Sequence, residues 1–99
     1  MNYEFHPEAE QELYEAAMHY ESKVPGLGRR LRDDVERVIK LILEHPELGS
    51  RLDDNLRHFV LGRFPFSVVY AATSDLVHIV AVAHGCREPG YWQLRVQDR

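Results

Sequence analysis

The spacing of the apolar residues changes once along this chain, and the change limits the folds that it can adopt. From residue 7 to residue 43 apolar side chains recur every three or four positions, which is the period of an amphipathic helix. From residue 57 to residue 84 they alternate or run together, as they do in strands. A chain of 99 residues has room for one domain. Helical segments followed by a run of strands predict a single α+β domain over residues 1–99.

Prolines and glycines place the boundaries of the elements. Pro7 suits the first position of a helix, and Pro25-Gly26 ends that helix. Because the connection at Pro25-Gly26 is short, we expect this helix and the next one to form an antiparallel hairpin. We expect a two-layer sandwich of order βααβββ plus a short C-terminal tail, with the hairpin packed on one face of an antiparallel sheet. The other face then meets solvent, the tail or a partner. The predicted elements are strand Met1–Phe5, helices Pro7–Lys23 and Leu27–Leu43, a loop at Glu47–Asn55, strands Arg57–Leu61, Phe66–Ala72 and Val77–His84, and a last short strand or helical turn at Trp92–Val96.

Composition argues against several classes of protein. One cysteine, Cys86, excludes a disulfide framework, and we expect it to be a small buried or half-buried side chain. We expect no metal, because His78 and His84 would share a strand face roughly 20 Å apart. There is no glycine-rich phosphate loop, so no cofactor is expected. Without a signal sequence or an apolar run of about 18 residues, a soluble cytoplasmic protein without membrane contact is predicted.

Charge is divided unevenly between the two halves of the chain. Residues 1–54 carry 7 Lys and Arg against 13 Asp and Glu, a balance of −6, whereas residues 55–99 carry 5 against 3, a balance of +2. The acidic half should repel nucleic acid, and the basic excess of the other half is too small to indicate nucleic-acid binding by itself.

Cationic, imidazole and aromatic residues gather in the C-terminal half, where they offer the chain's richest chemistry. Such a set could cleave RNA without a metal, since it supplies a base, an acid and a guanidinium for the phosphorane charge. It could equally form a protein-binding hot spot, or simply close the open face of the sheet. The residues concerned are Arg57, His58, Arg63, His84, Arg87, Tyr91 and Trp92.

At these residues the chain resembles a known superfamily. RFPFSVVY at Arg63–Tyr70, VHIVAVAH at Val77–His84 and REPGYW at Arg87–Trp92 are similar to segments of the RelE/ParE superfamily, the toxins of bacterial type II toxin–antitoxin (plasmid stabilisation) systems. FHPEAEQEL at Phe5–Leu13 and HPELG at His45–Gly49 extend the resemblance over nearly the whole chain. It implies the βααβββ fold and a small cognate antitoxin that binds DNA itself and folds a segment onto the toxin.

Two activities divide that superfamily. RelE-like members cut mRNA on the ribosome, whereas ParE-like members inhibit DNA gyrase by binding and need no catalysis of their own. Ribonuclease members carry an arginine just ahead of the tyrosine that ends the VVY-like strand, but Ser67, Val68 and Val69 precede Tyr70 here. This departure favours a ParE-like gyrase inhibitor.

The resemblance also suggests site residues for each activity. A target-binding surface of a ParE-like protein would comprise Arg63, His84, Arg87, Tyr91 and Trp92. In the alternative, a metal-independent endoribonuclease acting on the ribosome and mRNA, the catalytic candidates are Arg57, Arg63, His84, Arg87 and Tyr91. A third alternative is a module that has lost toxicity and still binds the antitoxin.

Overall fold

The N-terminal half forms the helical hairpin that its apolar period predicts. In the computed structural model, which describes residues 1–97, helix α1 spans Pro7–Lys23 and helix α2 spans Leu27–Glu44. His6 caps α1, because its Nδ1 accepts the N–H of Glu8 at 3.1 Å. Gly26 joins the helices with a φ of 88°, a conformation that glycine adopts without steric cost. None of the helices within the described residues is long and apolar enough to cross a membrane.

The strands form one five-stranded sheet in the order β1-β5-β4-β3-β2. Neighbouring strands are antiparallel from β2 to β5, which confirms the predicted fold class, while β1 runs parallel to β5. The hairpin connects β1 to β2 at the other edge of the sheet. A short strand, β2, lies inside the segment that was expected to be loop. The strands are β1 (Asn2–Phe5), β2 (Ser50–Arg51), β3 (Arg57–Val60), β4 (Phe66–Ala72) and β5 (Leu76–His84).

A bulge in β5 corrects one expectation from the sequence. Val69 faces Ala81 across the ladder, whereas Tyr70 faces Ile79, so Val80 has no partner and the alternation of side chains shifts there. His84, beyond the bulge, packs its ring edge-on against Phe66 of the helix-side core at 5.0 Å. His78, before the bulge, pairs instead with Glu4 of β1, whose carboxylate is 3.2 Å from its Nδ1. The two histidines therefore lie on opposite faces of the sheet and not on one.

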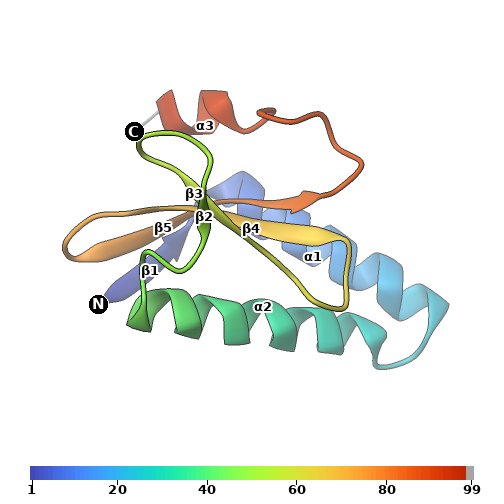
Figure 1. Ribbon diagram of the computed structural model, residues 1–99. Coiled ribbons are helices and arrows are strands. Elements are labelled where there is room, and N and C mark those ends of the chain that lie inside the picture. The colour runs from blue at the N-terminus through green and yellow to red at the C-terminus, as the bar shows by residue number, and fades with distance from the viewer. Residues whose placement is uncertain (98–99) are drawn as a thin grey trace.

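Each face of the sheet buries its own apolar cluster. Figure 1 shows helices α2 and α3 on opposite sides of the sheet. The helix-side cluster joins the apolar stripes of α1 and α2 to the inward side chains of β4 and β5. The opposite face is covered in part by the C-terminal tail, whose last turns form the short helix α3, Gln93–Gln97. Tail residues Tyr91, Trp92 and Val96 pack there on a second cluster, which comprises Leu56, Val69, Ala71, Val80, Ala81 and Ala83.

The two helices are in close contact at Gly28. A Cβ atom built on Gly28 would overlap the carbonyl oxygen of Ala17 and lie 3.1 Å from the Cβ of Glu21. The Gly28 N–H also donates to the Glu21 carboxylate at 3.1 Å. The α1–α2 contact therefore requires glycine at this position, although alanine is the better helix former.

We expect Gly28→Ala to destabilise the protein by about 1–3 kcal/mol, because the added methyl forces the helices apart. Urea denaturation followed by circular dichroism measures this loss. Gly62→Ala is the matched control, since nothing lies within 4 Å of a Cβ there, and its unfolding free energy should stay close to that of the parent. A stabilised Gly28→Ala protein would contradict the close approach, because helix propensity alone would then decide the outcome.

Candidate functional site

The candidate site begins where β1 leaves the side of β5. β1 pairs with β5 only as far as Ile79, after which the chain turns into α1 and the rest of that edge has no neighbouring strand. Two side chains take the place of the missing strand. An Oε1 atom of Glu12 accepts the N–H of Val82 at 3.0 Å, and Arg95 donates from Nη1 to the carbonyl of Val80 at 3.1 Å. Backbone groups that would otherwise be buried without partners are satisfied in this way.

Glu12 and Arg95 also bind each other through two parallel contacts. Nη1 of Arg95 is 2.9 Å from Oε1 of Glu12, and Nη2 is 2.8 Å from Oε2, with side chains only 10% and 14% exposed for Arg95 and Glu12 respectively. The Nε of Arg95 reaches Glu8 at 2.9 Å. Such a bidentate, largely buried pair joins helix α1 to the C-terminal helix α3 with a fixed geometry.

The surroundings of Glu12 keep it ionised. Burial by itself would raise the pKa of the Glu12 carboxyl, but hydrogen bonds from Arg95, Tyr91 and the Val82 N–H outweigh it and lower the pKa below its usual value. The same hydrogen bond from Arg95 to Glu12 raises the pKa of the Arg95 guanidinium. The pair therefore stays charged throughout the neutral range.

Tyr91 connects the buried pair to an exposed arginine, Arg87. The hydroxyl of Tyr91 donates to Oε2 of Glu12 at 2.7 Å, and burial together with this bond raises the pKa of the phenol. The guanidinium of Arg87 lies 3.9 Å from the centre of the Tyr91 ring and 3.9 Å from Oε2 of Glu12. Because the Arg87 side chain is 55% exposed, it presents a cation to solvent from an aromatic platform.

Trp92 completes this group, which we call the C-terminal surface: Glu12, Arg87, Tyr91, Trp92 and Arg95. The rings of Trp92 and Tyr91 meet edge to face at 5.2 Å, and Trp92 packs on the tail-side cluster. The indole Nε1 is buried and has no hydrogen-bond partner among residues 1–97. The structure thus brings together three of the five residues predicted for target binding.

The two other predicted target-binding residues lie near the same end of the sheet without joining that group. Nδ1 of His84 accepts the N–H of Cys86 at 2.9 Å, so a neutral His84 ring carries its proton on Nε2. Arg63 is on the β3–β4 turn, whose Pro65 carbonyl accepts the Gly85 N–H. The side chain of Arg63 lines a cavity on the helix side of the sheet, together with Arg30 and Arg37 of α2. Cys86 is exposed, contrary to the expectation of a buried or half-buried thiol, because it lies in the exposed turn that follows β5.

Arg57 is remote from the other catalytic candidates. It pairs in register with Tyr70, while His84 pairs with Phe66 four residues away along β4, a separation of roughly 13 Å along the strands. Its Nη1 donates to the carbonyls of Gly49 and Glu47 at 2.8 and 3.1 Å. This guanidinium therefore anchors the loop that follows α2.

Sequence reasoning missed Glu12 and Arg95, which hold the C-terminal surface together. Glu12 carried a signal, because it follows Ala9 by three positions and precedes Ala16 by four, inside the buried stripe of α1. A carboxylate in such a stripe needs a buried partner. The sequence does not identify that partner, since Arg95 is 83 residues away.

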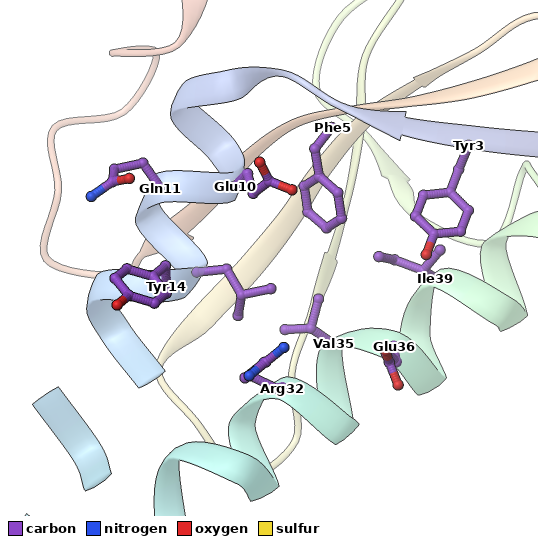
Figure 2. A pocket seen from close by; sticks show the side chains of 10 residues that line it. Tyr3, Phe5, Glu10, Gln11, Tyr14, Arg32, Val35, Glu36 and Ile39 are labelled. Carbon is purple, nitrogen blue, oxygen red and sulfur yellow. The ribbon is translucent and has the colours of Figure 1, made fainter. Parts of the chain in front are cut away.

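A second hollow lies between the open ends of the helices and β1 (Figure 2). We call it the hairpin crevice; its volume is about 510 Å³. Phe5 and Tyr3 enter it from β1, Tyr14 lines it from α1, and Val35 and Ile39 line it from α2. None of the residues predicted for the site lines it. Nowhere in residues 1–97 do three His, Cys, Asp or Glu side chains converge so as to hold a metal ion.

Comparison with known proteins connects this geometry to a family. A family model described as the ParE toxin of the type II toxin–antitoxin system, parDE, matches residues 3–89. The protein Toxin ParE2 of Mycobacterium tuberculosis, from strain CDC 1551/Oshkosh and from strain H37Rv, is 30% identical over 95 residues, which are 95% of this chain and 90% of the relative. A solved chain of the "Chromosomal ParDE TA system from P. aeruginosa" shares the fold, with a TM-score of 0.73 and 18% identity over 85% of this chain and 95% of that one.

The buried pair predicts how stability depends on pH. Because the Glu12 pKa is lowered by folding, its contribution is complete above the usual value of 4.5 and is lost as the pH falls through the lower, folded-state pKa. At neutral pH, we expect Glu12→Gln to lower the unfolding free energy by about 3 kcal/mol, since it removes the buried charge that pairs with Arg95 and leaves the exposed carboxylate of Glu8 as its partner. As the pH falls below 4.5, the unfolding free energy should decrease less steeply in the variant than in the parent. Urea denaturation at several pH values measures this difference.

Glu15→Gln on the same helix is the control for this measurement. Its carboxylate is exposed, and among residues 1–97 it accepts a hydrogen bond only from the side chain of Gln11. Its unfolding free energy should stay within about 0.5 kcal/mol of the parent at neutral pH. Equal acid sensitivity of the Glu12→Gln protein and the parent would show that the Glu12 carboxylate does not carry this dependence.

Proposed function

We propose, from the premise that this chain belongs to the family of ParE toxins of type II toxin–antitoxin systems, that it inhibits DNA gyrase by binding and is neutralised by a cognate antitoxin. In this proposal the toxin acts in the cytoplasm and meets DNA only indirectly, through its antitoxin. The C-terminal surface, with Arg87 at its exposed tip, is the part that contacts gyrase.

One observation supports the proposal of binding without catalysis: the candidates for RNA cleavage do not form one complete site, although His84, Arg87 and Tyr91 lie near one another. Arg57 is tied to loop carbonyls roughly 13 Å along the sheet from His84. The hydroxyl of Tyr91 donates a hydrogen bond to Glu12, and its raised pKa keeps the phenol neutral, so Tyr91 cannot serve as a base. Arg57 does lie beside Tyr70, but both side chains are bound to the loop after α2: the Tyr70 hydroxyl donates to the carbonyl of Pro46 and accepts the N–H of Gly49.

What remains at the C-terminal surface has the composition of a protein-binding hot spot. Arginine, tyrosine and tryptophan dominate such hot spots, and a cation held on an aromatic ring loses little freedom when it is buried by a partner. Arg87 supplies the charge, while Tyr91 and Trp92 supply half-buried apolar area beside it.

The alternative function, a metal-independent ribonuclease, is supported by one pair of neighbouring residues. His84 and Arg87 lie on one turn, since the N–H of Arg87 donates to the carbonyl of His84 at 3.0 Å. An imidazole with a free Nε2 and a guanidinium are groups that RNA cleavage uses. Mapping of mRNA 5′ ends after induction separates the two functions, because gyrase inhibition leaves translated messages without codon-phased cuts.

The test is supercoiling by purified gyrase with the toxin added. We expect inhibition by the parent protein and its relief by the antitoxin. Arg87→Ala should need about ten times more protein for half-inhibition, because the exposed charge and its ring contact are lost. Arg29→Ala, which removes another exposed arginine on α2, should inhibit as the parent does.

Failure of the parent protein to inhibit gyrase, shown to be folded by circular dichroism, would refute the proposed target. Inhibition by the parent together with full activity of Arg87→Ala would refute only the proposed surface.

A further inference from the structure

The turn between β3 and β4 and the N-terminal half of α2 border a cavity of about 1040 Å³. Arginines line it from both elements, and Phe64 of the turn and Tyr20 of α1 add aromatic rings that meet edge to face at 5.2 Å. Phe64 is buried and Tyr20 is half-buried, so the cavity combines apolar area with cations. We call it the arginine cavity and define it by Tyr20, Arg30, Arg37, Arg63 and Phe64.

Two of the three guanidinium groups in this cavity have no ionic partner within the fold. Arg37 is bound, since its Nη2 lies 2.8 Å from Oδ1 of Asp34. Arg30 and Arg63 are exposed, and within residues 1–97 their side chains form neither an ion pair nor a hydrogen bond. Asp33 is the other acidic residue of the lining, so three arginines against two aspartates leave a balance of +1. The free guanidiniums are therefore available to an acidic partner.

The position of Arg30 does not stabilise its own helix. Arg29 and Arg30 lie in the first turn of α2, which contains no acidic residue, and the helix dipole disfavours cations at that end. The Glu21 carboxylate already accepts the N–H groups of Gly26 and Gly28 there, at 2.8 and 3.1 Å. An anion bound in the cavity would therefore be held by the arginine side chains and not by the helix terminus.

The arginine cavity adjoins the C-terminal surface through the β3–β4 turn. The carbonyl of Pro65 accepts the N–H of Gly85 at 2.8 Å, and the carbonyl of His84 accepts the N–H of Arg87 at 3.0 Å. The turn that carries Arg63 is thus bound to the turn that carries Arg87. A protein interface of standard size covers about 800 Å² of each partner, so one partner can cover both places.

The charges of the lining favour a protein segment over nucleic acid as the occupant. Asp33 and Asp34 would repel a continuous polyanion such as DNA, and the whole chain carries a net charge of −4. A protein segment can place single carboxylates beside Arg30 and Arg63 and an apolar side chain against the aromatic rings. The surface therefore suits an acidic segment of a protein that also contacts Arg87.

We propose that the arginine cavity binds an acidic segment of gyrase, whose aspartates or glutamates pair with Arg30 and Arg63. This inference rests on the proposed inhibition of gyrase. It adds a second contact beside the C-terminal surface and extends the interface to helix α2. Exposed charge pairs of this kind orient the partners and speed their association, so the affinity should depend on salt.

Neighbouring arginines on α2 provide a matched pair of variants. Arg30→Ala and Arg29→Ala remove the same charge from the same helical turn, but only Arg30 lines the cavity. In supercoiling by purified gyrase, Arg30→Ala and Arg63→Ala should each need about ten times more protein for half-inhibition, whereas Arg29→Ala should stay within about twofold of the parent. Because the helix dipole disfavours both α2 arginines, neither α2 variant should melt below the parent.

Calorimetric titration of the toxin into gyrase gives a second measure. Raising the salt concentration from about 50 to about 200 mM should weaken binding of the parent more than binding of Arg30→Ala. Equal half-inhibition by Arg30→Ala and Arg29→Ala would overturn the inference and leave the gyrase target intact, while failure of the parent to inhibit would refute the target as well. Binding of the parent to DNA alone, or self-association, that Arg30→Ala abolishes and Arg29→Ala keeps would overturn the inference and assign the cavity to DNA or to a second copy.

Discussion

The structure depends on how the unpaired part of β5 is closed. β5 has nine residues and its neighbour β1 only four, so β5 extends past β1 into the region where α1 begins. A sheet strand cannot keep buried N–H and C=O groups without partners, because each would cost about 1–3 kcal/mol. Glu12 and Arg95 meet this requirement from two distant parts of the chain, one binding the N–H of Val82 and the other the carbonyl of Val80.

This closure explains why the short C-terminal helix has a definite place. α3 is five residues long, too short to be stable by its own hydrogen bonds. The ion pair with Glu12 and the packing of Trp92 and Val96 on the tail-side cluster hold it against the sheet. A buried pair of this kind is weak evidence for net stability, since an apolar pair of equal volume can be as stable. Its geometric effect is clearer, because it fixes the position of Tyr91 and, through Tyr91, the direction of Arg87.

Much of the fold follows from local patterns in the sequence. Both helices and the three long strands occupy nearly the predicted ranges, because periodicity, Pro7 and Pro25-Gly26 are local signals. The bulge at Val80 could not be predicted from VHIVAVAH. This strand is apolar on both faces, so it lacks the alternation of apolar and polar residues that a bulge would interrupt. For the same reason, two histidines in that strand were assigned to one face when they lie on two.

Only the residues of the candidate site that lie close together in the sequence could be predicted. Arg87, Tyr91 and Trp92 stand out because they are close in sequence and unusual in composition. Glu12 and Arg95 do not, because an ion pair between distant residues follows from the tertiary arrangement and not from any local pattern. Helix α1 connects what the sequence leaves separate: Glu12 faces β5 and α3, while Glu10 and Tyr14 face the hairpin crevice. Any movement of α1 along β5 must change the Glu12 bonds to Val82 and Arg95 together, since both end on one carboxylate. Helix α1 therefore contributes to both surfaces of the molecule, through Glu12 on one side and through Glu10 and Tyr14 on the other.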